Sequence, residues 1–200
     1  MNRPARPHPV GLAVLLAVVG CGAFAEQPPQ RGELDCAFIP VQEPEDEVPD
    51  CAYQDSQGQL LIRREALEAM DFGSDGVAQV VVGRALLYVT PAGRTAPALP
   101  FDNGADYFVE GLARTQRNGK IGFVNTDLDE VVIPTWDFAF PFKSGLAVVC
   151  QGCMPRRIED SEHSEVVGGK WGYIDKKGRV VVPVTLESDE LPPRGEVATE

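Results

Sequence analysis

The sequence predicts a mainly β protein built from tandem three-stranded β-meander or hairpin repeats of about 35 residues each, with one short helix near residues 64–70. Three observations lead to this fold class. Aromatic residues recur at intervals of 35 residues with one longer gap, a glycine follows three of these four aromatic residues after five positions, and short apolar runs end at proline. The chain has 200 residues, of which 20 are glycine and 17 are proline, so turns are frequent.

The first 25 residues have the pattern of a secretory signal peptide. Arg3 and Arg6 form a basic start, residues 10–20 carry no charge, and no acidic residue occurs before residue 26. The apolar run is shorter than the roughly 20 residues that span a bilayer. Two processing sites remain open. Cleavage after Ala25 would release a secreted chain, whereas residues 18–21 resemble a bacterial lipobox with Cys21 as the acylated residue.

This pattern predicts export to the periplasm or cell envelope, with a membrane association only if Cys21 is lipidated, as in an outer-membrane lipoprotein. We expect four segments along the chain. These are a signal peptide at 1–25, an acidic Pro-rich segment at 26–51, a repeat domain at 52–186 and a disordered acidic tail at 187–200. Residues 26–35 also have the composition of a disordered segment.

Four cysteines remain after the signal region, namely Cys36, Cys51, Cys150 and Cys153. An even number of cysteines in an exported chain favours disulfide bonds, and four cysteines allow three pairings. Proximity in the sequence favours Cys36–Cys51 and Cys150–Cys153. The first bond would close an acidic, Pro-rich loop that cannot pack against itself.

Cys150 and Cys153 also have the C-x-x-C spacing of thiol redox enzymes and zinc sites. A thioredoxin-type site needs a helix after the motif to lower the thiol pKa, and the following residues 154–165 do not predict such a helix. A zinc site needs four ligands, and His163 would supply only a third. We therefore favour a structural disulfide, with a thiol/disulfide or metal-binding role as the alternative.

The repeats follow one another along the chain. Tyr53, Tyr88 and Phe123 are each 35 residues apart, and Tyr173 follows after a longer gap that residues 151–168 account for. The best matching segments are Gly169-Lys170-Trp171-Gly172-Tyr173 and Gly119-Lys120-Ile121-Gly122-Phe123. A second match aligns residues 108–113 with residues 142–147 and places Gly111 and Gly145 at equivalent positions.

These motifs resemble the WG repeat of bacterial proteins over residues 52–186. Residues 169–178 carry the resemblance most strongly, whereas Ile121 replaces the tryptophan of one unit and Tyr88 lacks the preceding glycine. The resemblance implies tandem β-hairpin units in exported or surface proteins. It implies no catalytic residues and no cofactor.

Each unit is expected to be a three-stranded meander. Asn118-Gly119 is a type I′ hairpin signal, and Gly178 favours a second turn after residues 171–174. We expect Gly172 to let a neighbouring backbone approach closely. Residues 63–70 contain strong helix formers and predict the short helix.

Several clusters allow a functional interpretation, although a structural one is favoured for each. Four aromatic residues in 136–142 could form a platform for sugar or peptide, but aromatic residues at repeat positions normally build the core, as we also expect for Phe101, Tyr107 and Phe108. Five acidic residues between 102 and 130 form no complete calcium loop, so we interpret them as solvated turn carboxylates; they are Asp102, Asp106, Asp127, Asp129 and Glu130. We expect no metal site.

The net charge of −12 argues against a nucleic-acid partner. No catalytic constellation is recognised, so we expect a non-catalytic binding or scaffolding module whose partner is an unknown protein or envelope glycan. A weaker alternative is an enzyme with an acidic site built on Asp137 or Asp106.

Overall fold

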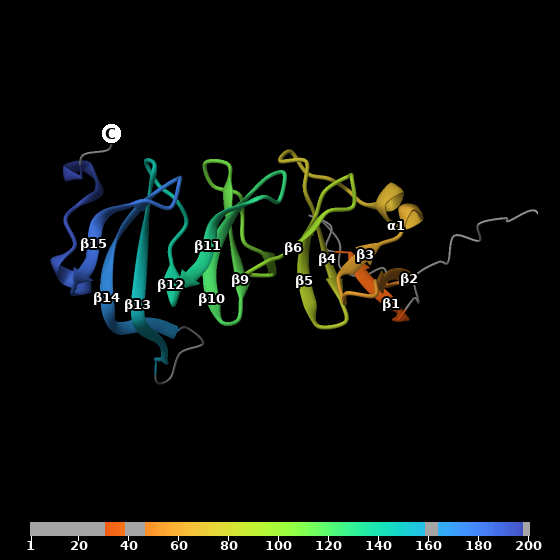
Figure 1. The fold of residues 1–200 in the computed structure, drawn as a ribbon, viewed down its shortest axis with the longest axis horizontal. Coiled ribbons are helices and arrows are strands. Elements are labelled where there is room, and N and C mark those ends of the chain that lie inside the picture. The colour runs from red at the N-terminus through yellow and green to blue at the C-terminus, as the bar shows by residue number, and fades with distance from the viewer. Residues whose placement is uncertain (1–30, 39–46, 159–163, 198–200) are drawn as a thin grey trace, which may run out of the picture.

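The structure is a computed structural model that describes residues 31–38, 47–158 and 164–197. Its antiparallel sheets lie one after another along the longest axis, in the order of the sequence (Figure 1). Strand β3 and helix α1 lie near one end of this row and β15 near the other, so the sheets form an open row in the described part of the chain. The mainly β fold class with one short helix is confirmed.

The first sheet has six strands in the order β3-β2-β1-β4-β5-β6. Its strands are β1 (Arg31–Phe38), β2 (Glu47–Gln54), β3 (Leu60–Ile62), β4 (Ala78–Val82), β5 (Ala85–Val89) and β6 (Thr95–Pro97). Helix α1 (Arg64–Ala69) connects β3 to β4 and buries Ala66 against this sheet. Tyr53 lies in β2 and Tyr88 in β5, each with a strand on both sides.

The second sheet is the meander β9 (Leu112–Arg117), β10 (Lys120–Asn125) and β11 (Glu130–Trp136). Asn118 and Gly119 both have positive φ, as the expected type I′ turn requires, and they join Arg117 to Lys120. A two-stranded ribbon, β7 (Pro100–Phe101) and β8 (Gly104–Ala105), precedes it. Phe123 lies in the middle strand and is fully buried.

The third sheet has the order β12-β13-β14-β15. Its strands are β12 (Phe138–Ala139), β13 (Leu146–Arg157), β14 (Ser164–Asp175) and β15 (Val180–Leu186), and the short 3-10 turns η1 (Ser188–Glu190) and η2 (Arg194–Glu196) follow. Tyr173 lies in β14 between β13 and β15. Leu191 and Val197 pack against the core of this sheet.

The glycines at positions 122 and 172 occupy sites where the neighbouring strand is distorted. From Ile121 to Phe123, two steps along β10 face four steps along β11, from Trp136 to Val132. The same register change occurs between β14 and β15. A Cβ at Gly122 would overlap the Val132 carbonyl oxygen. A Cβ at Gly172 would overlap the Val182 carbonyl oxygen, so the expected close backbone approach at Gly172 is confirmed.

The strands that carry Tyr88 and Tyr53 lack this distortion on the side of β6 and β3. Leu87 precedes Tyr88, and Ala52 precedes Tyr53. Strands β5–β6 and β2–β3 keep a regular register over their whole paired length. At Gly122 and Gly172 the displaced backbone leaves no room for a Cβ, so the glycine accompanies the distortion at these two sites. The β1–β2 pair makes the same change of register from Leu34 to Cys36 without a glycine, so other sites do not require one.

Three segments differ from the expectation. Strand β1 and part of β2 lie within residues 26–51, so the first sheet begins before the boundary placed at 52, and residues 31–35 are ordered in β1. Most of the segment 151–168, interpreted from the sequence as an insertion into one unit, continues the β13–β14 hairpin as far as the pair Arg157 and Ser164. The tail after residue 187 contains η1 and η2.

Residues 1–25, where the sequence predicts a signal peptide, lie outside the described residues, and so do the predicted processing positions Cys21 and Ala25 and also His163. Within the described ranges no helix has the length and apolar character that crossing a bilayer requires.

Candidate functional site

The most unusual polar feature of the molecule is a buried ion pair between Asp106 and Arg114. Arg114 lies in β9 and is 5% exposed, whereas Asp106 follows β8 and is 2% exposed. The guanidinium donates Nε to Oδ2 at 2.7 Å and Nη2 to Oδ1 at 2.9 Å. The Arg114 backbone N–H also donates to Oδ2, so both carboxylate oxygens are satisfied. Bidentate pairing of this kind compensates the cost of burying two charges.

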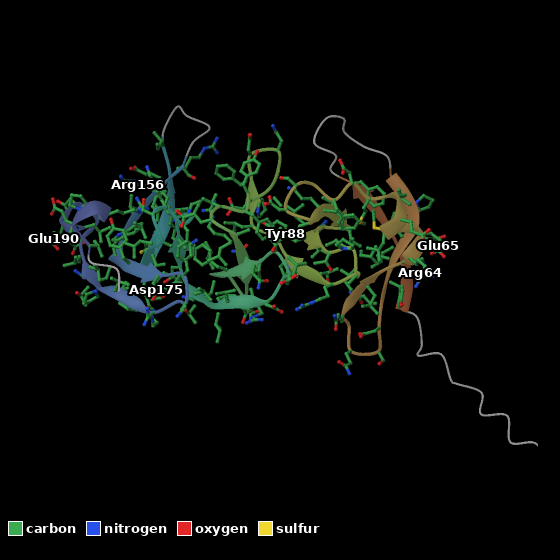
Figure 2. The ribbon with its side chains drawn as sticks, turned by 90° about the horizontal axis from the view of Figure 1, so that it is seen from above. Arg64, Glu65, Tyr88, Arg156, Asp175 and Glu190 are labelled. Atoms are coloured by element: carbon green, nitrogen blue, oxygen red, sulfur yellow. A yellow bond between two sulfur atoms is a disulfide. The ribbon has the colours of Figure 1, made fainter. Side chains whose placement is uncertain are left out.

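The ion pair connects all three sheets. Tyr88 of the first sheet donates its hydroxyl to the Asp106 backbone oxygen at 2.6 Å, and burial raises the pKa of this phenol far above its usual range. Arg114 donates Nη1 to the Ala139 carbonyl in β12 of the third sheet at 3.0 Å. Tyr88 lies near the middle of the row in Figure 2. We refer to Tyr88, Asp106, Arg114 and the Ala139 carbonyl as the polar junction.

Three aromatic side chains lie on the surface near this junction. Phe101 is 48% exposed, Tyr107 60% and Phe140 45%. The Arg114 guanidinium stacks 5.7 Å from the centroid of the Phe101 ring, and Tyr107 meets Phe101 edge to face at 6.0 Å. Phe140 directly follows Ala139, whose carbonyl binds Arg114. The Phe140 ring contacts Phe138 and Trp171 of the third sheet, with centroids 5.0 Å and 6.5 Å away, and does not contact the other two rings. We call Phe101, Tyr107 and Phe140 the exposed aromatic group.

The other aromatic residues build the interior, as the structural interpretation expected. Phe142 is buried against Phe123 with ring centroids 4.6 Å apart, and Trp171 is buried at 4% exposure. Trp136 and Phe138 are partly buried at the second core. Phe108 packs on Tyr88 at 5.1 Å. The core interpretation was therefore wrong for Phe101, Tyr107 and Phe140, which lie on the surface.

The Cys150-x-x-Cys153 motif lies within strand β13, where Gly152 has a positive φ and bends the strand. The two cysteines are at disulfide-bonding distance, and both are buried. Asp137 holds this bend, because its Oδ2 accepts the Gly152 N–H at 2.7 Å and its Oδ1 accepts Lys120 Nζ. A strand follows the motif in place of the helix that activates redox thiols.

Low pH is expected to weaken the hydrogen bonds by which Asp137 stabilises the strand at Gly152. The hydrogen bond from Lys120 and that from Gly152 lower the pKa of the Asp137 carboxyl below its ordinary value. A carboxyl with a lowered pKa in the folded state stabilises the fold above its unfolded pKa, near 4, and loses this contribution as the pH falls further. The difference in unfolding free energy between the wild-type protein and Asp137→Asn should therefore shrink between about pH 6 and pH 3. Urea titration at each pH measures it.

The matched control is Asp127→Asn, which changes an exposed carboxylate that has no ion pair within the described part of the chain. Its difference from the wild-type protein should stay small at every pH. A difference for Asp137→Asn that does not change with pH would contradict the assignment.

Cys36 and Cys51 form the second cysteine pair, joining β1 to β2. Both sulfur atoms belong to the core of the first sheet. The separation of 15 residues predicts a stabilisation of about 3 kcal/mol by the bond. Replacing both cysteines by serine should therefore lower the unfolding free energy by about this amount or more, measured in oxidising buffer. Reductant should cause the same loss in a variant in which only Cys150 and Cys153 are serine, and no loss once all four cysteines are serine, which attributes the loss to this bond.

The acidic residues interpreted as turn carboxylates separate into two kinds. Asp129 pairs with Arg94 at 2.7 Å, and Asp102 and Asp127 are exposed, so these agree with the interpretation. Asp106 is buried and paired, so the interpretation was wrong for it. No three His, Cys, Asp or Glu side chains among the described residues are placed to hold a metal ion together.

The remaining motif glycines lie in turns or in close contacts. Gly111 and Gly145 follow residues with positive φ and have positive φ themselves, so the two matching segments make the same turn. Glu110 Oε2 accepts the Gly145 N–H at 3.0 Å, which joins the two turns. Gly169 leaves no room for a Cβ against Cys150 Sγ. Lys170 pairs with Glu187 at the surface.

Sequence reasoning missed Arg114, which is the centre of the polar junction. The available signal was an arginine on the strand face that also carries Leu112, with an acidic residue eight positions earlier. Neither feature is distinctive by itself, because strands commonly carry exposed arginines.

The row of antiparallel sheets, with a glycine beside the aromatic residue of two middle strands, defines a mainly β protein. The family model for the WG containing repeat matches residues 121–152 and 171–188. Two segments of the chain thus match the WG repeat. The first covers β10 to β12 and the first half of β13, and the second covers the end of β14 and all of β15. No curated protein and no solved structure matches the chain.

Proposed function

We propose that this chain is an exported, non-catalytic binding or scaffolding module of the bacterial cell envelope. The signal-peptide pattern of residues 1–25 supports export, and the WG-repeat match supports a repeat protein. The two carboxylates considered for an acidic enzyme site, Asp106 and Asp137, are both bound to cations and to backbone groups. Their hydrogen bonds hold strands together.

The exposed aromatic group is the observation that carries this proposal. Three large aromatic side chains stand at half exposure, close to a rigid, fully hydrogen-bonded junction. Aromatic side chains supply large contact areas at low entropic cost and are enriched in recognition surfaces. A partner protein or an envelope glycan would therefore meet a preformed surface.

We also propose that the meanders are copies of one unit of about 35 residues. Several contacts between neighbouring meanders join residues 35 positions apart. They are Arg94 to Asp129, Thr95 Oγ1 to the Leu60 carbonyl, and the Gly145 N–H to Glu110. Contacts at this separation are expected where one unit stacks on the next.

Binding to isolated cell envelope tests the proposal. The purified mature protein should cosediment with envelope fragments, and the triple variant Phe101→Ala, Tyr107→Ala, Phe140→Ala should lose most of this binding while keeping its circular dichroism. The control is Ile133→Ala with Val180→Ala, which removes exposed apolar side chains elsewhere. Equal binding by the triple variant would refute the role of the exposed aromatic group.

The mass of the mature N-terminus tests export. Cleavage after Ala25 predicts a chain that starts at Glu26, and lipidation predicts a chain that starts at an acylated Cys21. An uncleaved chain that stays in the cytoplasm would refute the envelope assignment.

A further inference from the structure

A pocket of about 200 Å³ opens beside the exposed aromatic group. One wall is the loop between α1 and β4, with Asp71 and Asp75. The other is formed by Tyr107 and Phe108, and Tyr88 lies deeper in the pocket. Tyr107 therefore belongs both to the exposed aromatic group and to this pocket.

The uncompensated charge of the pocket is negative. Asp71 and Asp75 are exposed, and neither makes an ion pair or hydrogen bond to another residue of the described ranges. Asp106 also lines the pocket, but Arg114 neutralises it. None of the lining residues is Lys, Arg or His. The two loop carboxylates are therefore left without a cation.

The aromatic walls add a second attraction for positive charge. The rings of Tyr88 and Phe108 lie 5.1 Å apart, and Tyr107 is largely exposed at the rim. The face of an aromatic ring attracts a guanidinium or ammonium group, and more strongly where water is excluded. Carboxylates accept the N–H groups of the same cation. The aromatic rings and the two carboxylates therefore both favour a guanidinium or ammonium group.

We propose that this pocket binds an arginine or lysine side chain of a partner polypeptide. The inference rests on the proposed function and narrows its partner to a basic polypeptide, since a neutral glycan carries no positive charge to compensate Asp71 and Asp75. The net charge of −12 favours the approach of such a partner from a distance. The cation enters the pocket, and the neighbouring apolar surface of the partner covers Phe101.

Titration of the mature protein with N-acetyl-arginine amide, followed by NMR, tests the inference. Backbone amide shifts should move for residues 71–79 and 106–108, and the binding should weaken with added salt. The neutral analogue N-acetyl-citrulline amide, which has nearly the same shape, should bind at least about tenfold more weakly, a difference of about 1.4 kcal/mol. Equal binding of the two probes would overturn the inference.

The variant Asp71→Asn with Asp75→Asn should weaken the binding of the arginine probe to the level of the citrulline probe. Asp102→Asn is the control, since it changes an exposed carboxylate in the turn between β7 and β8 that does not line the pocket. Unchanged affinity in the double variant would overturn the inference, as would a neutral peptidoglycan fragment that binds the same residues more tightly than the arginine probe.

Failure of this inference is distinguishable from failure of the proposed function. Phe101 and Phe140 do not line the pocket. The variant Phe101→Ala with Phe140→Ala should therefore still bind the arginine probe but bind the cell envelope more weakly. If the probe fails but envelope binding still depends on these two rings, the pocket inference falls and the proposed function stands.

Discussion

Replacing Arg114 by alanine should lower the free energy of unfolding by about 3 to 5 kcal/mol. The substitution leaves the Asp106 carboxylate buried without its cation and removes the hydrogen bond to the Ala139 carbonyl. A buried charge without a partner is far more costly than the loss of a surface ion pair. Urea-induced unfolding followed by tryptophan fluorescence and by circular dichroism measures the change.

Arg117→Ala is the matched control, because Arg117 is in the same strand and pairs with Glu130 at the surface. Its loss should be at most about 1 kcal/mol. Arg114→Lys keeps the charge but loses the bidentate geometry, so its effect should lie between the two. A loss for Arg114→Ala no larger than for Arg117→Ala would show that the polar junction has no special role.

Gly172→Ala and Gly122→Ala should each destabilise the protein by about 2 to 3 kcal/mol. Each added methyl group would overlap a backbone carbonyl of the adjacent strand. A backbone atom cannot move aside as the end of a flexible side chain can. The strand must shift, and the register between β14 and β15 or between β10 and β11 must change. Thermal and urea unfolding of both variants measure the loss.

Gly195→Ala is the control for these variants, since nothing lies within 4 Å of the added Cβ and its φ is not positive. It should change the stability by less than about 1 kcal/mol. If Gly172→Ala is as stable as the wild-type protein, the distorted strand does not depend on the glycine.

The meanders of the C-terminal half were predictable because their signals are local. Asn118-Gly119 fixes the turn between β9 and β10, and residues 169–178 define β14 and the following turn. Pairing of cysteines near in sequence predicted both pairs that the structure shows at bonding distance. These features depend on residues that are neighbours in the chain.

Strand β1 was not predicted, because the composition of its segment suggested disorder and the alternation of its apolar residues was overlooked. Residues 26–51 are acidic and rich in proline, which is typical of disorder, yet Leu34, Cys36 and Phe38 alternate as in a strand with one buried face. Within the sheet, β1 pairs with β4, which lies more than 40 residues away in the sequence. Such a long-range pairing leaves no local signal.

The candidate site was predicted only in part for a similar reason. Asp106 was noticed as an acidic residue, but its burial depends on Arg114 and on Tyr88 of another sheet. The exposure of Phe101 and Tyr107 depends on how two sheets meet. Repeat position alone could not separate these rings from Phe142, which is buried.

Because the polar junction joins all three sheets, we expect them to open as one unit. Native-state amide hydrogen exchange tests it most directly, with the wild-type protein and Arg114→Met compared strand by strand. In the wild-type protein, the protected amides of β5, β10 and β14 should have similar opening free energies. In the variant, the opening free energies of β5 and β14 should differ by more than about 1 kcal/mol. Opening free energies that already differ in the wild-type protein, or that Arg114→Met leaves unseparated, would contradict it.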